Sequence, residues 1–363
     1  MATALLKLYF YNQNGGNIML NINLLEENKD MMLHTEGNRT LDATGRDILL
    51  SGVNCASLEW SYNPPKLMKS IFAALDEWKS NCIRLPLHPN GWFGFFHEQQ
   101  IHDKDGTGYK EFVDEIVNQI AARKKYVILD YHQSNCGVLG QKDYGYMPDM
   151  HSILFWEDVA IRYQNHPNVL FGLFNEPRVI GWDIWKNGGT ITSQCKIDGQ
   201  MRVSTFKTPG MQKLIDIVRK AGADNIVITG GIDWGWRLDG MKNGYALEDK
   251  KGNGIILDSH VYPWKDLDWD TYVTVMADEY PIIIGECGHS GEERKPENPQ
   301  KEVSAVWVPK LLKWMDDHNY HVTAWDFHHL AGPCLVENLE DYEPTKYWGA
   351  YFKEFLKQRS ERL

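Results

Sequence analysis

The sequence lacks any apolar stretch long enough to cross a membrane. No run in the 363 residues approaches the ~20 consecutive apolar residues that a spanning helix needs. Positive charge is also scarce, because 38 Lys and Arg stand against 49 Asp and Glu, for a net charge of −11. Nucleic acids and anionic membrane surfaces are bound through clustered positive charge. We therefore predict that the protein binds neither nucleic acid nor membrane.

Cysteine is sparse, and its spacing does not indicate a metal site. The six cysteines stand singly, without a C-x-x-C pair or zinc-ligand spacing. Reduced, partly buried thiols are the simpler interpretation, and one or two disulfides in an exported protein are the alternative. Four histidines near the C-terminus are divided among predicted helix, strand and loop, which is not a zinc pattern. We predict no metal and no cofactor. The histidines are His318, His321, His328 and His329.

A convincing secretory signal is missing as well. The first residues read MATALLKLYFYNQNGG, and their only early positive charge interrupts a short apolar stretch. Localisation stays open on this evidence. Secretion is favoured if a signal peptide has been removed.

Short apolar runs alternate with amphipathic helical patterns from Ile48 onward. Eight such runs predict strands, at 48–54, 82–86, 126–132, 169–174, 225–229, 254–260, 280–286 and 320–325. Helical patterns lie between them, near 66–78, 112–120, 151–163, 211–218, 271–278, 304–318 and 348–357. This α/β alternation favours a closed (β/α)8 TIM barrel. An open doubly wound sheet is the competitor, but it usually carries a glycine-rich phosphate turn after its first strand, and VNCASLEW is not one.

The N-terminal segment does not fit a strand–helix unit. HTEGNRTLDATGRDILLSG has turn residues at 36–38 and 43–45, which predicts a β-hairpin. We expect residues 1–46 to form an N-terminal extension whose hairpin caps the barrel bottom, and residues 47–363 to form the catalytic barrel. The sequence has no internal repeat or linker, and we expect a monomer.

Polar and aromatic side chains gather at the predicted strand ends. A single Arg or His there is more often structural than catalytic, because buried polar groups are usually just hydrogen-bonded. In a barrel, however, all strand ends ring one opening, where catalytic groups of such folds lie. The convergence predicts a functional site. Its members are Arg84, Asp130, His132, Asn175, Glu176, His260, Tyr262, Glu286 and Trp325.

Two of these residues, Glu176 and Glu286, predict acid–base and nucleophilic chemistry. Hydrolysis of a glycosidic bond needs two carboxyl groups, one as acid and one as nucleophile. The acid needs a raised pKa, from apolar surroundings or a nearby carboxylate. The nucleophile must stay ionised, which Arg84 and the hydroxyl of Tyr262 would secure. Asn175 would hold the sugar 2-hydroxyl.

Tryptophan is abundant, with 14 residues, and several lie just beyond predicted strand ends. Pyranose faces stack on indole rings, so these residues are candidates for sugar contact. The alternative is that large aromatics pack loops onto the barrel, which we expect of about half. We take Trp60 and Trp234 as the substrate-binding candidates. The others are Trp92, Trp182, Trp185, Trp236 and Trp264.

Taken together, the motifs resemble glycoside hydrolase family 5, the cellulase family of retaining barrel glycosidases. The matching stretches are NCIRLPL, LDYH, LFGLFNEP, SHVYPW, IIIGECG and AWDFH. The resemblance implies Glu176 as general acid/base, Glu286 as nucleophile, and a covalent glycosyl-enzyme. It gives supporting positions to Arg84, His132, Asn175, His260, Tyr262 and Trp325.

The expected substrate is a β-linked oligo- or polysaccharide, and an endo-β-1,4-glucanase is the first choice. An endo-β-1,4-mannanase or another β-glycosidase of the family is the alternative. A non-catalytic carbohydrate-binding barrel is a further alternative, but it would be expected to lack at least one of the two carboxylates. A metal-dependent barrel lyase or isomerase would be expected to have a lysine or clustered metal ligands at its strand ends, and this sequence has neither there. Two features depart from the family pattern: AWDFHH replaces a shorter Trp-Ser or Trp-Glu segment, and residues 181–209 are long.

Overall fold

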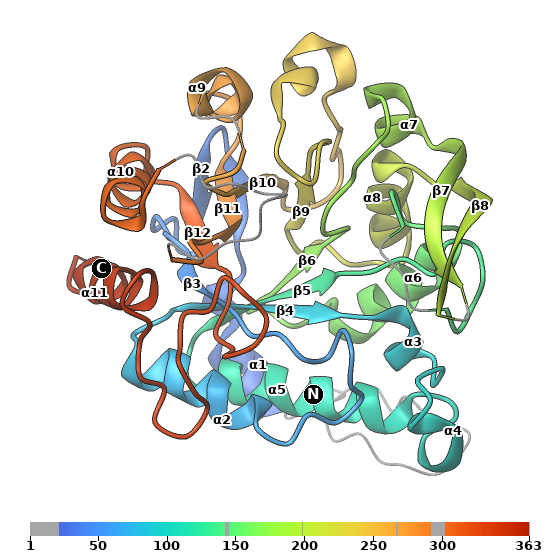
Figure 1. Ribbon diagram of the computed structural model, residues 1–363, viewed down its shortest axis with the longest axis horizontal. Coiled ribbons are helices and arrows are strands. Elements are labelled where there is room, and N and C mark those ends of the chain that lie inside the picture. The colour runs from blue at the N-terminus through green and yellow to red at the C-terminus, as the bar shows by residue number, and fades with distance from the viewer. Residues whose placement is uncertain (1–21, 142–144, 198, 266–267, 292–301, 363) are drawn as a thin grey trace, which may run out of the picture.

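Eight parallel strands close into a barrel in the computed structural model, which describes residues 22–141, 145–197, 199–265, 268–291 and 302–362 (Figure 1). The order around the barrel is β10-β11-β12-β3-β4-β5-β6-β9. The predicted (β/α)8 class is confirmed. The strands are β3 (Ser51–Asn54), β4 (Cys82–Leu87), β5 (Tyr126–Tyr131), β6 (Val169–Gly172), β9 (Val227–Gly230), β10 (Ile255–Val261), β11 (Ile282–Cys287) and β12 (His321–Ala324).

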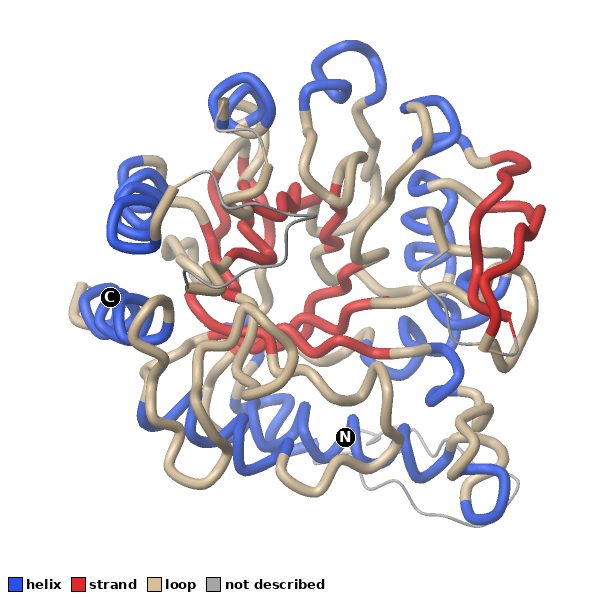
Figure 2. The backbone as a smooth tube through the Cα atoms, viewed as in Figure 1, coloured by secondary structure: helices blue, strands red, loops and turns tan. Residues whose placement is uncertain are grey.

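Helices surround the barrel on its outside (Figures 1 and 2). In α5, Val113, Ile116, Val117 and Ile120 recur at helical spacing and are fully buried, which is why this face packs inward. None of the described helices has the length and apolar character that crossing a bilayer requires. The principal helices are α2 (Leu67–Phe72), α5 (Thr107–Ala122), α6 (His151–Tyr163), α8 (Met211–Lys220), α10 (Ser304–Asp317) and α11 (Gly349–Ser360).

Short helical segments fill the remaining connections. The predicted helix near 271–278 is divided into α9 (Trp269–Tyr272) and the 3-10 turn η4 (Thr274–Met276). The π-helical turn η2 (Ala73–Glu77) extends α2. The others are α1 (Ile22–Glu27), η1 (Lys29–Met31), α3 (Pro89–Trp92), α4 (Gln99–His102), α7 (Trp182–Asn187) and η3 (Met241–Tyr245).

The lower interior of the barrel is a packed apolar cluster. Every residue of β4, β5, β10 and β11 is buried, as expected for parallel strands covered on both faces. Side chains therefore close the barrel at its base, and the polar strand ends stand at the other opening. The buried residues of this cluster are Leu33, Leu50, Cys82, Tyr126, Ile128, Leu170, Ile226, Ile228, Ile256 and Ile283.

The predicted N-terminal hairpin is present as β1 (His34–Glu36) paired antiparallel with β2 (Arg39–Leu41). Its Thr40 Oγ1 lies 2.9 Å from Nε2 of His321, the first residue of β12. The other ring nitrogen of His321 accepts the amide of Leu50 at 2.9 Å, and burial lowers the pKa of His321 to about 3. A neutral imidazole thus joins the hairpin to the strand starts. Residues 1–21 lie outside the described residues, and a boundary at residue 46 stays a prediction.

The long segment after Glu176 forms α7 and a second hairpin, β7 (Gly189–Ile197) with β8 (Gln200–Thr208), at the outer edge of the barrel (Figure 1, right). A disulfide joins its Cys195 to Cys136 in the loop after β5, with S–S 2.32 Å and Cα–Cα 6.4 Å. Ser204 also donates to the carbonyl of Cys136 at 3.1 Å. The interpretation of six reduced thiols is therefore wrong for this pair. Cys55, Cys82, Cys287 and Cys334 are free.

Candidate active site

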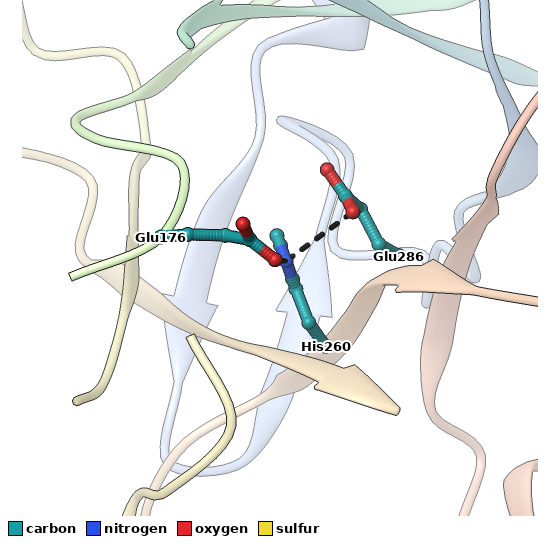
Figure 3. A group of neighbouring side chains, drawn as sticks. All are labelled: Glu176, His260 and Glu286. Atoms are coloured by element: carbon teal, nitrogen blue, oxygen red, sulfur yellow. Dashed lines mark hydrogen bonds and ion pairs between the residues drawn. The ribbon is translucent and has the colours of Figure 1, made fainter. Parts of the chain in front are cut away.

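Glu176 and Glu286 extend toward each other across the open end of the barrel (Figure 3). Glu286 is part of β11. Glu176 follows β6. The chain between them continues along the strand direction, because the amide of Leu173 donates to the carbonyl of Ile228 and the amide of Asn175 donates to that of Tyr131. One carboxylate oxygen of each glutamate and a ring nitrogen of His260 all lie within 4.8 Å of one another. The structure thus brings the two predicted catalytic residues together.

Glu286 is held at both oxygens. Nη1 of Arg84 donates to Oε1 at 3.0 Å, and the hydroxyl of Tyr262 donates to Oε2 at 2.8 Å. Burial lowers the pKa of Arg84, but the charges of Asp130 and Glu286 outweigh it and raise the pKa above its usual value. Arg84 therefore stays charged beside Glu286. Its direction is set by contacts to Asn54 Oδ1 at 2.8 Å, Asp130 Oδ1 at 3.0 Å and Asn175 Oδ1 at 2.7 Å.

His260 stands between the two glutamates. Its Nδ1 is 3.0 Å from Oε1 of Glu176 and 3.4 Å from Oε2 of Glu286, and its Nε2 is 3.4 Å from Oδ2 of Asp258. The register of β10 against β11 shifts between Asp258 and His260, and this irregularity sets His260 beside Glu286. Burial opposes the charged imidazole, but Glu286 and Asp258 raise the pKa of His260 to about 10.

The two carboxyl groups form one electrostatic unit with His260. Burial raises the pKa of Glu286, and the negative charge of Glu176 raises it further. Burial acts in the same direction on Glu176, but the hydrogen bond and charge of His260, together with the charges of Arg178 and His132, outweigh it and lower the pKa of Glu176. These directions are the reverse of the expectation from the sequence, in which the acid Glu176 has the raised pKa, because His260 bonds to Glu176. An ionised Glu176 therefore pairs with a protonated His260.

His132 and Trp325 form a stacked pair beside the glutamates. Their ring centroids are 5.3 Å apart and the planes differ by 10°. Nδ1 of His132 contacts Asp130 at 2.7 Å. Burial opposes the charged ring, but the bond to Asp130 and the nearby carboxylate charges together raise the pKa of His132. Asn175 Nδ2 lies 3.5 Å from Nε2 of the same ring. The predicted supporting residues at the ends of β4, β5, β6, β10 and β12 thus lie in one connected group. They are Arg84, His132, Asn175, His260, Tyr262 and Trp325.

Trp60 and Trp234 expose about two fifths of their surface, 40% and 43%. They follow β3 and β9, which are four positions apart in the ring of eight strands and so lie on opposite sides of the opening. Trp60 contacts His328 edge to face at 5.7 Å, and Trp234 lies over the guanidinium of Arg178 at 4.1 Å. Three other candidates are buried and pack loops onto the barrel. They are Trp92, Trp185 and Trp236.

Among the described residues, one group of His and carboxylate side chains has the spacing that a metal ion accepts. It is the same trio, Glu176, His260 and Glu286. The contacts of these groups to Arg84 and Tyr262 also suit two carboxylates without a metal. That no metal is needed stays a prediction.

The sequence profile of cellulase (glycosyl hydrolase family 5) matches residues 41–330. This chain belongs to that family. Cellulase CelDZ1 of Thermoanaerobacterium sp is 27% identical over 241 residues, which are 66% of this chain and 54% of the relative, so the chain spans about half of that protein. An endoglucanase of Paenibacillus polymyxa is 24% identical over 355 residues, 85% of this chain and 83% of the relative.

Solved structures show the same fold. The native β-glucanase SdGluc5_26A of Saccharophagus degradans has a TM-score of 0.71 at 24% identity, covering 91% of this chain and 94% of that one. The same enzyme is also known in complex with cellotetraose, with a TM-score of 0.71 at 23% identity. The same barrel fold thus extends over nearly the whole chain.

Sequence reasoning missed several members of this family-5 site. Asn54 and Asp258 contact Arg84 and His260 from the strands themselves, and Arg178 stacks on Trp234. Strand alternation offered a signal for Asp258, since it stands two residues before His260 and so faces the same side. Arg178 gave none, because its partner is 56 residues away and follows a different strand.

Proposed function

We propose that this chain is a retaining glycoside hydrolase that cleaves β-1,4-linked glucan within the chain, as an endo-β-1,4-glucanase. The proximity of Glu176 and Glu286, with one oxygen of each within 4.8 Å of the other, carries the proposal. Carboxyl groups about 5–5.5 Å apart are typical of retaining enzymes, whereas inverting enzymes leave about 6.5–9.5 Å for a water. A non-catalytic barrel would not need to keep both carboxylates and their partners.

In the first step, the Glu286 carboxylate attacks the anomeric carbon and the bond to the leaving oxygen breaks. Arg84 and Tyr262 aim its oxygens and stabilise its charge before attack. Glu176 delivers a proton to the leaving oxygen. In the second step, Glu176 takes a proton from water, which attacks the same carbon and releases Glu286. Asn175, held by Arg84, binds the sugar 2-hydroxyl, and Trp325 forms the floor of the site.

His260 carries the proton for the first step. Because the imidazole carries it at Nδ1, 3.0 Å from Oε1 of Glu176, a short transfer gives the protonated acid. A sugar that covers the exposed part of Glu176 favours this transfer, because two charged groups become two neutral groups in a less polar surrounding. Glu176 and His260 thus act together as the general acid.

A glucan substrate is supported by the relatives and by the exposed aromatics. The endoglucanase names of the relatives and the cellotetraose complex of the β-glucanase point to this sugar. Trp60 and Trp234, on opposite sides of the glutamates, would stack sugar units on both sides of the cleaved bond. Such an arrangement favours cleavage within a chain. The Cys136–Cys195 disulfide supports an oxidising compartment and hence an exported protein.

The test is a panel of soluble polysaccharides scored for reducing ends and product length. We expect carboxymethylcellulose and barley glucan to be cleaved to mixed oligosaccharides, well ahead of glucomannan, galactomannan, xylan and xyloglucan. A preference for galactomannan would transfer the proposal to a mannanase. Release of a single short product from the start would contradict endo cleavage.

A further inference from the structure

Arg178 places a buried cation behind the exposed ring of Trp234. The Cζ atom of Arg178 is 4.1 Å from the ring centroid, and only 5% of the residue is exposed. Its Nη1 donates to the backbone carbonyl of Glu176 at 3.2 Å, and its own amide donates to the carbonyl of Tyr146 at 3.0 Å. The guanidinium therefore joins the indole to the strand end that carries the acid/base.

The turn that carries Trp234 has an unfavourable backbone. Asp233, Trp234 and Gly235 follow one another with φ of 60°, 61° and 67°. The left-handed region is unfavourable for a residue that carries a Cβ atom, and only glycine enters it freely. Two of the three residues here are not glycine. Strained residues persist where the surrounding structure holds them, often next to functional groups.

Hydrogen bonds to its backbone hold this turn in place. The amide of Trp234 donates to the carbonyl of Pro177 at 2.9 Å, directly after Glu176. Lys265 Nζ donates to the carbonyl of Asp233 at 2.7 Å. The amide of His260 donates to the carbonyl of Gly235 at 3.1 Å. The turn is therefore attached to His260 and to Pro177, the residue that follows Glu176.

We propose that Arg178 is a positioning residue that fixes the indole of Trp234 as a platform for the first sugar of the leaving group. This rests on the proposed function. The acid/base protonates the oxygen of the departing sugar, so a ring anchored beside Glu176 faces that side of the cleaved bond. With one face of the indole covered by the guanidinium, the leaving sugar stacks on the other face. Because Arg178 also contacts the backbone of Glu176, it holds the indole of Trp234 at a constant position relative to the proton donor.

The chain offers a matched control. Arg123 lies over the ring of Phe72 at 4.0 Å, which is the same kind of stack on the outer helices, far from the strand ends. Arg123→Leu therefore reports what the loss of such a stack does to the fold alone. Arg178→Lys keeps the charge but not the planar group that stacks.

The experiment compares two substrates. Cellotetraose releases a sugar on cleavage, whereas 2,4-dinitrophenyl cellobioside releases dinitrophenolate. We expect Arg178→Leu and Trp234→Ala each to lower kcat/KM on cellotetraose about tenfold more than on the aryl substrate, mainly through KM. Arg178→Lys should fall between parent and Arg178→Leu, and Arg123→Leu should leave the ratio of the two substrates unchanged.

The double variant Arg178→Leu/Trp234→Ala decides the coupling. If Arg178 acts through the indole, the double variant loses no more on cellotetraose than Trp234→Ala alone. The proposal would be overturned if the loss of kcat/KM in the double variant equalled the product of the two single losses. It would also be overturned if each variant lost equally on both substrates. If Arg178→Leu does not fold, Arg178→Lys takes its place in the cycle. A parent protein that cleaves neither substrate would instead reject the proposed function.

Discussion

The Nδ1 atom of His260 lies 3.0 Å from Oε1 of Glu176, the carboxyl group that we propose as the proton donor. A second contact, 3.4 Å from Nε2 to Asp258, lies behind the ring. The imidazole is thus the middle member of a chain that runs from a buried carboxylate to the proposed acid/base.

The first prediction concerns Asp258→Asn. In the parent protein the Gly285 amide donates to Oδ1 of Asp258 at 2.8 Å. The side-chain oxygen of the asparagine can accept the same bond, so we expect the strand pairing to be unchanged. The negative charge that helps raise the pKa of His260 to about 10 is lost, however. The protonated imidazole then disappears at lower pH, and the alkaline limb of kcat/KM moves to lower pH. The pH profile from 5 to 11 measures this. Asp239→Asn, at the surface pair with Arg237, serves as control. An unmoved alkaline limb would remove His260 from the proton path.

The second prediction separates the two glutamates. Glu176→Ala should nearly abolish polysaccharide cleavage, while an aryl glycoside with a good leaving group needs little protonation and still forms the glycosyl-enzyme. Added azide should then restore its turnover. Glu286→Ala should be inactive on both substrates, with losses of at least about 10³-fold.

Labelling provides an independent check of the same roles. A 2-fluoro glycoside inactivator should modify Glu286 in the parent protein, as read by peptide mass spectrometry. A label on Glu176 would reverse the assignment.

The third prediction concerns the buried carboxyl group of Glu59, which accepts the Ser57 amide at 2.7 Å. Burial raises its pKa from 4.5 to about 7. A raised folded-state pKa means that its contribution to stability is complete below pH 4.5 and is lost as pH rises through 7. The loss amounts to up to about 3 kcal/mol at about 1.4 kcal/mol per pH unit. Glu59→Gln cannot ionise, so it should become more stable relative to the parent between pH 5 and 8.

Urea unfolding at pH 5, 6, 7 and 8 measures this difference. Glu354→Gln on the surface of α11 controls for the removal of one carboxylate. A stability difference that does not change with pH would show that Glu59 ionises freely.

The fourth prediction is that dialysis against a chelator leaves activity unchanged. Two carboxylates supply both proton transfer and covalent catalysis, so the trio of Glu176, His260 and Glu286 works without an ion. Activity and thermal unfolding are measured together. Lost activity with an unchanged unfolding temperature, restored by added divalent metal, would make the protein a metalloenzyme.

The fifth prediction concerns the disulfide. Cys136 and Cys195 are 59 residues apart, and in the chain-entropy model closing such a loop stabilises the fold by about 4 kcal/mol. Cys136→Ser/Cys195→Ser should lower the free energy of unfolding by about 2–4 kcal/mol, as should a reductant on the parent. Cys334→Ser, which removes a free thiol, is the control. Equal stability with and without reductant would show that the pair is not bonded in solution.

The sequence by itself determined the barrel and the identity of its rim residues. Parallel strands covered on both faces consist of continuous apolar runs, so LFGLF, YVIL and YPIII predict strands without further information. The polar residues that interrupt such runs must leave the core at the strand ends. This places Glu176, Glu286 and Arg84 at one opening, because the carboxyl ends of all the parallel strands of a closed barrel lie at the same end.

Only the tertiary structure decided how these side chains pair. The bulge that sets His260 beside Glu286, the Cys136–Cys195 bond and the stack of Arg178 on Trp234 join segments far apart in the chain. Hydrophobic periodicity reports burial within one segment, and it carries no information about which distant segment lies opposite. Those contacts depend on strand register and on the path of each loop across the closed barrel. The fold class could therefore be predicted locally, whereas the arrangement of charges and protons required all eight strands in place.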